Sequence, residues 1–178
     1  MMKKLIVVAA AILILAAVPA FGQHPANIGI DVGWANLDKD VTGANAWQLG
    51  FRAGYFALSW LEIEGQVAGA RASEDVGSVN LDTTLLAGLV NGVFSYPSRK
   101  ISPYALIGVG GANLQVTPGI SSFSDFAVAW QLAAGARFFV AKSVALRAEV
   151  GHLREKTFDA WNGHWRVTGG IVWSFGER

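Results

Sequence analysis

Apolar residues alternate with polar or small residues along most of this chain, and this period of two constrains the fold more than any other feature. In residues 26–37, apolar side chains stand at 28, 30, 32 and 34, and they alternate with Asn, Gly, Asp and Gly at 27, 29, 31 and 33. The same pattern recurs in 46–55, 61–67, 126–138, 144–150 and 165–175. Strict alternation is typical of a β-strand with one apolar face. These six segments are therefore predicted strands.

Two further segments, 80–94 and 101–116, carry apolar residues at both parities. They are long and lack helix caps, so they are also predicted as strands, but which of their residues point inward is not assigned. The predicted total is eight strands. The connectors alternate between short ones at 56–60, 95–100 and 140–143 and longer, more polar ones at 38–45, 73–77, 117–124 and 154–163. Short turns at one end and longer loops at the other are the layout of a transmembrane barrel.

The first 22 residues have the pattern of a secretory signal peptide. Lys3 and Lys4 precede an apolar stretch over 5–18, which Pro19 ends, and small residues lead up to Gln23. Such a leader is removed on export, and the apolar stretch is shorter than the about 20 residues of a spanning helix. We predict a signal peptide over 1–22 and one β-barrel domain over 23–178.

The content of the polar face decides between two eight-stranded barrels. A soluble ligand-binding barrel keeps its apolar face inside, whereas a membrane barrel has an apolar outer band and a polar interior. Outside the leader, the lysines all lie in connectors, and the polar face mixes charges with Gly and Ala. Small neighbours make room for charged side chains in a narrow lumen, and buried charges must be paired. The predicted lumen ion-pair network is Asp31, Arg52, Glu62, Glu64, Arg137, Arg147, Glu149 and Arg166.

Aromatic residues lie near the strand ends on the apolar face. Tryptophan and tyrosine favour the boundary between membrane and water, and seven tryptophans is a high number for this length. The predicted aromatic girdle is Trp34, Trp47, Tyr55, Phe126, Trp165, Trp173 and Phe175.

Charge and composition exclude several classes of function. The formal net charge of +1 does not suggest nucleic-acid binding, which needs a clustered basic face, and the chain has no cysteine. Disulfides and cysteine-ligated metals are therefore impossible. No phosphate loop, metal cluster or nucleophile motif is present, so we expect no cofactor, no metal and no catalytic residue.

Several motifs together resemble the bacterial outer-membrane β-barrel domain family, specifically the small eight-stranded OmpA-like barrels. They are AWQLGFRAGY at 46–55, WLEIEG at 60–65, ISPY at 101–104, WQLAAGAR at 130–137, SVALRAEV at 143–150 and GGIVWSF at 169–175. The resemblance implies an all-β, antiparallel, up-and-down transmembrane barrel in a Gram-negative-type outer membrane. It implies a monomer that contacts outer-membrane lipid, and the barrel-assembly machinery during insertion, but no nucleic acid. A porin-family label would describe kinship and not conduction.

The expected function is structural, or an interaction at the surface through the extracellular loops, without catalysis. One alternative is a lipid A-modifying enzyme, because outer-membrane deacylases carry a His and a Ser two residues apart on a lipid-facing strand. Here His152 is followed at that spacing by Arg154, which is no nucleophile. Glu62 and Glu64 could resemble a glycosidase pair but fit better as arginine partners. The other alternative is a soluble periplasmic barrel that binds a small ligand.

Overall fold

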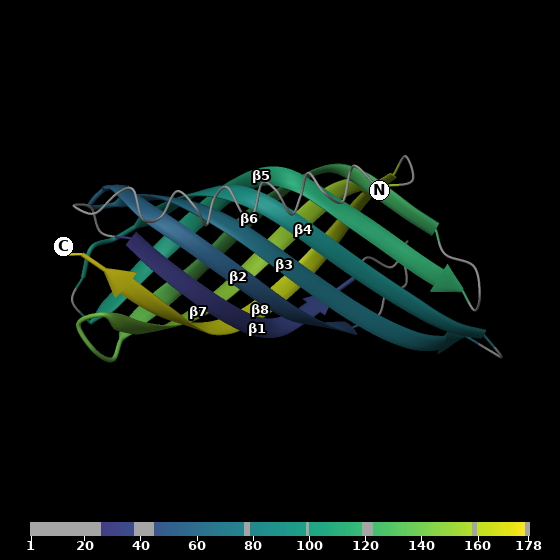
Figure 1. The fold of residues 1–178 in the computed structure, drawn as a ribbon, viewed down its shortest axis with the longest axis horizontal. Helices are drawn as coiled ribbons and strands as arrows, with labels where there is room; N and C mark the ends of the chain where they lie inside the picture. Colours follow the sequence, from purple (N-terminus) through teal and green to yellow (C-terminus); the bar gives the residue numbers. More distant parts are fainter. Residues whose placement is uncertain are drawn as a thin grey trace.

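The computed structural model describes residues 26–37, 45–76, 79–98, 100–118, 123–157 and 160–176. They form eight antiparallel strands in a closed barrel (Figure 1). The strands are β1 Ala26–Asn36, β2 Asn45–Leu58, β3 Leu61–Val76, β4 Val79–Ser95, β5 Ile101–Pro118, β6 Phe123–Phe139, β7 Val144–Thr157 and β8 Ala160–Phe175. The predicted all-β fold is confirmed, while the predicted signal peptide over 1–22 lies outside the described residues. Within the described part of the chain, no helix has the length and apolar character needed to cross a membrane.

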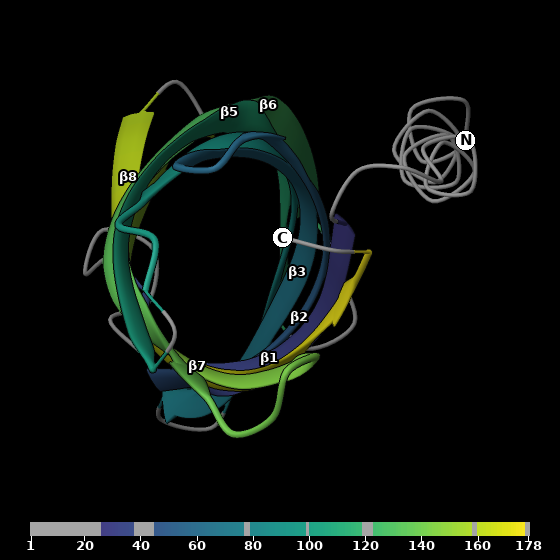
Figure 2. The same ribbon diagram turned by 90° about the vertical axis from the view of Figure 1, so that its left-hand side faces the viewer.

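The barrel closes through pairing of the first and last strands. The register runs from Ala26 opposite Phe175 to Asn36 opposite Trp165, and the end-on view in Figure 2 shows the resulting ring. Closure leaves no unpaired edge. Because the strand number is even, β1 begins and β8 ends at the same end of the barrel, which we call the turn end; the opposite end is the far end.

The connections at the far end differ from the prediction. The polar segments 73–77 and 154–163 were expected to be loops, but β3 continues to Val76 and pairs with β4 up to Val79. Likewise β7 continues to Thr157, which pairs with Ala160 of β8. A membrane-crossing strand needs about 9–11 residues, whereas β3 to β6 have 16 to 18. Polarity in these segments therefore marks strand that extends past an apolar band, and it does not mark a loop.

Apolar side chains cover the outside of the barrel. Val128, Leu49 and Val109 are 69%, 60% and 60% exposed in mid-strand, whereas the charged residues of alternate positions are buried. The structure also shows which residues of 80–94 and 101–116 point inward. They include Leu85, Leu89 and Val93 of β4 and Leu106 of β5.

The interior consists of two layers. Charged and amide side chains predominate in the half near the turn end, beside a small apolar cluster that includes Val93 and Leu106, and apolar side chains predominate in the half near the far end. The apolar layer contains Ala35, Leu37, Ala46, Ala70, Ala72, Leu85, Ala87, Leu89, Ala112, Leu114, Ala129 and Leu153. Buried side chains thus occur in both halves of the described interior.

Candidate functional site

Arg52 of β2 is the centre of the charged layer. Its Nε lies 2.6 Å from Oδ1 of Asp31, its Nη1 lies 3.1 Å from Oε1 of Glu64, and its Nη2 lies 2.8 Å from Oε1 of Glu149. All four side chains are almost completely buried. The structure thus places Glu64, and not Glu62, beside Arg52.

Arg147 of β7 shares two of these carboxylates. Its Nη1 lies 2.6 Å from Oε2 of Glu64, and its Nη2 lies 2.7 Å from Oε2 of Glu149. Its Nε donates to the hydroxyl oxygen of Tyr104 over 2.7 Å, and that hydroxyl donates to Glu149 over 2.8 Å. The guanidinium carbon also lies 4.6 Å from the centre of the Tyr104 ring. Two arginines and two glutamates therefore form one connected cluster that Tyr104 closes on one side.

Arg137 of β6 forms a separate pair with Glu62. Its Nη2 donates to Oε2 of Glu62 over 2.7 Å, and Asn27 donates to the other carboxylate oxygen over 2.9 Å. The guanidinium carbon of Arg137 lies 5.7 Å from the centre of the Phe56 ring and 5.3 Å from that of Tyr104. Such cation–π contacts add to the stabilisation of a desolvated cation.

A chain of amides joins Arg166 of β8 to the cluster. Its Nη2 donates to Oε1 of Gln131 and lies 3.6 Å from Oε1 of Glu149. Nε2 of Gln131 donates to Gln66 over 2.8 Å and to Asn91 over 2.5 Å. All eight charged residues of the predicted network thus lie buried in the lumen, each within 4 Å of an oppositely charged partner.

A further polar pair lies closer to the far end. Nε2 of His164 lies 2.8 Å from Oε2 of Glu155, and both side chains are buried. Glu155 was assigned to a connector from the sequence, but β7 extends through it. Among the described residues, no group of His, Asp and Glu has an arrangement that could hold a metal ion.

Glycines provide the space that the charges occupy. A Cβ added at Gly54 would collide with the carboxylate of Glu62, and one added at Gly50 would collide with that of Asp31. These positions show why small residues accompany charges on the inward parity, since a buried carboxylate needs room as well as a partner.

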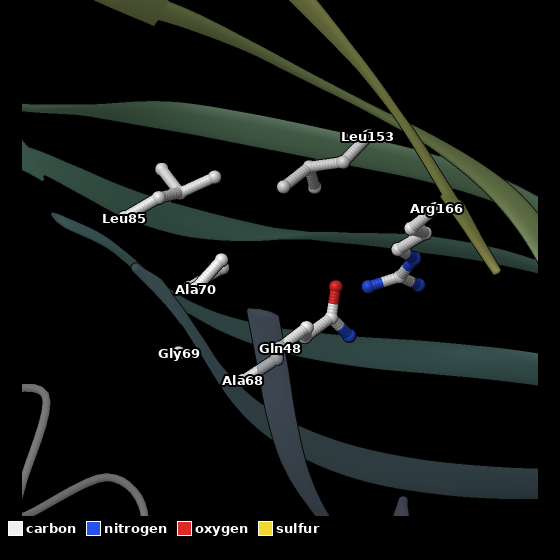
Figure 3. Close-up of a pocket in the computed structure, with 8 residues that line it drawn as sticks. Gln48, Ala68, Gly69, Ala70, Leu85, Leu153 and Arg166 are labelled. Carbon is white, nitrogen blue, oxygen red and sulfur yellow. The ribbon is translucent and has the colours of Figure 1, made fainter. Parts of the chain in front are cut away.

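A small cavity marks the boundary between the two layers (Figure 3). The Gln48 amide and the Arg166 guanidinium point toward each other on one side, and Leu85 and Leu153 lie on the other. The centre of a water molecule has about 10 Å³ of free space there, which is room for roughly one water.

The aromatic residues of the predicted girdle fall into two groups on the outer face. Tyr55, Trp173 and Phe175 lie near the turn end, beside the start of β1. Toward the far end lie Trp34, Trp47, Phe126 and Trp165, and the rings of Trp34 and Trp47 are 3.6 Å apart. Eight residues separate Trp47 from Tyr55, which at about 3.3 Å per residue and a tilt near 40° corresponds to roughly 20 Å along the barrel axis.

Sequence reasoning missed Tyr104 and Asn91, although both are central to the network. Each lies in a segment with apolar residues at both parities, because the inward positions of β4 and β5 mix polar with apolar residues. The hydroxyl of Tyr104 and the amide of Asn91 are polar groups at inward positions, which could have indicated a place in the network. The sequence alone does not show which residues of these two strands point inward, so this indication could not be used.

The arrangement has limited chemical capacity. Glu62, Glu64 and Glu149 each accept hydrogen bonds from an arginine, so these carboxylates are engaged and shielded from solvent. On the outer wall, the His152 ring packs 4.8 Å from that of Trp165, and the side chain two residues on is Arg154. The buried site can hold a barrel together, but it offers no accessible acid, base or nucleophile.

Comparison with known proteins gives a family and a set of similar folds. The family model described as outer membrane protein beta-barrel domain matches residues 6–175. Among solved structures, Neisserial surface protein A has a TM-score of 0.68 at 14% identity, over 85% of this chain and 96% of that one. Ail, the attachment invasion locus protein of Yersinia pestis, has a TM-score of 0.61 at 17% identity, over 86% of this chain and 99% of that one.

The N-terminal β-barrel domain of Pseudomonas aeruginosa OprF has a TM-score of 0.55 at 17% identity, over 86% of this chain and 99% of that one. No curated protein matches the sequence. At these identities the solved structures show only that the fold is shared. The match to the family model shows membership of a family.

Proposed function

The chain belongs to the outer membrane protein beta-barrel domain family, and from this premise we propose that it is an integral outer-membrane protein with a closed, non-conducting lumen. The observation that carries the proposal is the inverted distribution of side chains: charges are paired inside, and apolar residues cover the outside. A soluble barrel would place these two sets the other way round. The spacing of the aromatic groups supports the same placement, since a membrane barrel has an apolar band about 25 Å tall between its girdles.

The closed lumen follows from its two layers. Ion pairs block the turn-end half, and apolar side chains, including Leu37 and Leu114, block the other half. Open aqueous channels occur in barrels of about 16 strands or more. The protein therefore acts as a membrane-spanning scaffold, and small-solute passage is not part of its role.

A structural or surface-interaction role without catalysis fits this scaffold. The described strands β3 and β4 extend toward the far end with exposed polar side chains: Arg71 lies 3.6 Å from Asp82 across the two strands, and Ser73 donates to the same aspartate. The extended strands therefore provide the surface for contacts outside the membrane. The enzyme alternative lacks support at its key position, because Arg154 stands where the deacylase pattern needs a hydroxyl.

Fractionation of cells that express the full chain tests the membrane placement. We expect the folded protein in the outer-membrane fraction and resistance of that fraction to extraction with high salt. Recovery of folded protein in the soluble periplasmic fraction would contradict the proposal and favour the soluble ligand-binding barrel. Single-channel recording in planar bilayers tests the closed lumen: we expect no discrete conductance steps, and steady open steps would contradict it.

A further inference from the structure

Basic side chains stand in a row on the outer wall of β7 near the far end. His152, Arg154 and Lys156 occupy every second position, on the parity at which Leu146 and Val150 are exposed. This parity faces the membrane side of the barrel wall. Arg154 and Lys156 are the charged members of the row, and two cations on an otherwise apolar surface cost desolvation unless something negative faces them.

Tryptophans of the neighbouring strands border this row. The His152 ring centre lies 4.8 Å from that of Trp165, and the Arg154 guanidinium carbon lies 5.7 Å from the centre of the Trp161 ring. On the other side, Trp130 of β6 pairs with Arg154 in the register. The guanidinium thus lies next to an aromatic ring.

Charge on this wall is not balanced within the wall. The outward residues of β6 and β8 beside the row are apolar, glycine or serine, and no acidic residue is among those that the structure describes. The other outward arginine of the far-end half, Arg71, has Asp82 at 3.6 Å. Arg154 and Lys156 therefore differ from Arg71 in offering their positive charge to an external anion.

The depth of the row matches the headgroup layer of a membrane. His152 lies opposite Trp165 in the register, at the level of the far-end aromatic group. Arg154 is two residues further along β7, which is roughly 5 Å along the barrel axis at about 3.3 Å per residue and a tilt near 40°. Each polar layer of a bilayer is about 5–7 Å thick, so Arg154 lies where lipid phosphates are found.

We propose that the wall formed by Arg154 and Lys156, with Trp161 and Trp165 beside them, binds the phosphate of an anionic lipid in the leaflet at the far end. The guanidinium fork suits phosphate oxygens, the lysine adds a second positive charge, and the tryptophan rings contact the upper part of the acyl chains. The inference rests on the proposed membrane placement and adds to it a specific lipid site.

Native mass spectrometry of the full chain folded in detergent tests the site. The probes are dioleoyl phosphatidic acid, dioleoyl phosphatidylcholine and inorganic phosphate, each titrated separately. Membrane-surface cations contribute about 1 kcal/mol per residue toward anionic lipid, so two of them predict about thirtyfold tighter binding of phosphatidic acid than of phosphatidylcholine. The R154Q/K156Q double variant should lose most of this preference, and R154K should keep part of it.

R71Q is the matched control, because it removes an outward arginine of the far-end half that already has an acidic partner. It should leave the preference within about twofold of wild type, since exposed paired charges contribute little. Equal binding of the two lipids, or a preference that survives R154Q/K156Q, would overturn the site. An equal loss in R71Q would show a general charge effect and also overturn it. Binding of inorganic phosphate as tight as that of phosphatidic acid would assign the site to a free anion, against the proposal.

Failure of the membrane placement gives a different result. In that case the chain stays folded in buffer without detergent or lipid, and neither lipid remains bound to wild type, which overturns the site together with the placement. A barrel that folds only with detergent or lipid yet shows no preference contradicts the lipid site alone.

Discussion

The pair between Arg137 and Glu62 offers the sharpest test of the charged interior. Both side chains are buried, at 1% and 0% exposure, and they meet over 2.7 Å. Arg52, Arg147 and Arg166 share carboxylates with one another, whereas the described contacts of Glu62 link it to Arg137 and Asn27. Removing one partner of a buried pair leaves an uncompensated charge and costs about 3–5 kcal/mol. Arg137→Met and Glu62→Met should each lower the free energy of unfolding by that amount.

The double variant should cost less than the sum of the two single variants. Once both charges are gone, no buried charge is left uncompensated, so we expect a coupling energy of about 2–3 kcal/mol. Urea unfolding in phosphatidylcholine vesicles, followed by tryptophan fluorescence, measures all four corners of the cycle. The control is the exposed pair of Arg71 and Asp82, at 71% and 40% exposure, for which each removal should cost less than about 1 kcal/mol. Neutral single variants at Arg137 and Glu62 would refute a dry, paired lumen.

Two further predictions concern the outer face and the small residues. Phe51→Arg should destabilise the barrel in lipid by about 2–4 kcal/mol, the cost of arginine near the midplane of a barrel wall, because Phe51 is exposed and lies midway between Trp47 and Tyr55 on β2. Ala141→Arg, in the bend after β6, should be tolerated, and equal effects in a vesicle-folding assay would mean that the faces are misassigned. Gly54→Ala should lower the free energy of unfolding by about 1–3 kcal/mol, because the added Cβ would meet the Glu62 carboxylate. Gly69→Ala should be nearly neutral, since the nearest atom to its added Cβ is Leu86 Cδ1 at 3.9 Å. Urea midpoints that change equally for the two glycines would contradict the packing.

The alternation of polar and apolar residues predicted the strands and their inward faces where the inward side chains are consistently polar or small. β1, β2 and β8 carry polar or small residues at nearly every inward position, so their parity could be read directly. β4 could not be read this way, because Leu85 and Leu89 point into the apolar layer while Asn91 points into the charged one. Where inward side chains are apolar, they no longer differ from the apolar outward ones, and the alternation of polar and apolar residues disappears from the sequence.

Register and strand length were the other limits of the sequence. Arg52 lies opposite Gln66, which makes Glu64 its diagonal neighbour and leaves Glu62 too far along the strand. Diagonal neighbours in a sheet are within reach of long side chains, but parity carries no information about register. The far-end strands were mistaken for loops for a related reason: polar residues mark exposure to water, and a strand that extends past the membrane is as exposed as a loop.

The central claim is that the barrel is inverted, with lipid outside and a dry lumen inside, and β4 tests it most directly. The chain has no cysteine, so single cysteines can be placed at Leu85, Leu86, Ala87, Gly88 and Leu89 and spin-labelled in lipid vesicles. The account predicts that collision with oxygen dissolved in the bilayer is high at 86 and 88 and low at 85, 87 and 89. Collision with a water-soluble nickel chelate should be low at all five. High chelate accessibility at 85, 87 and 89 would show an open, water-filled lumen, and the absence of any period of two would contradict the barrel wall itself.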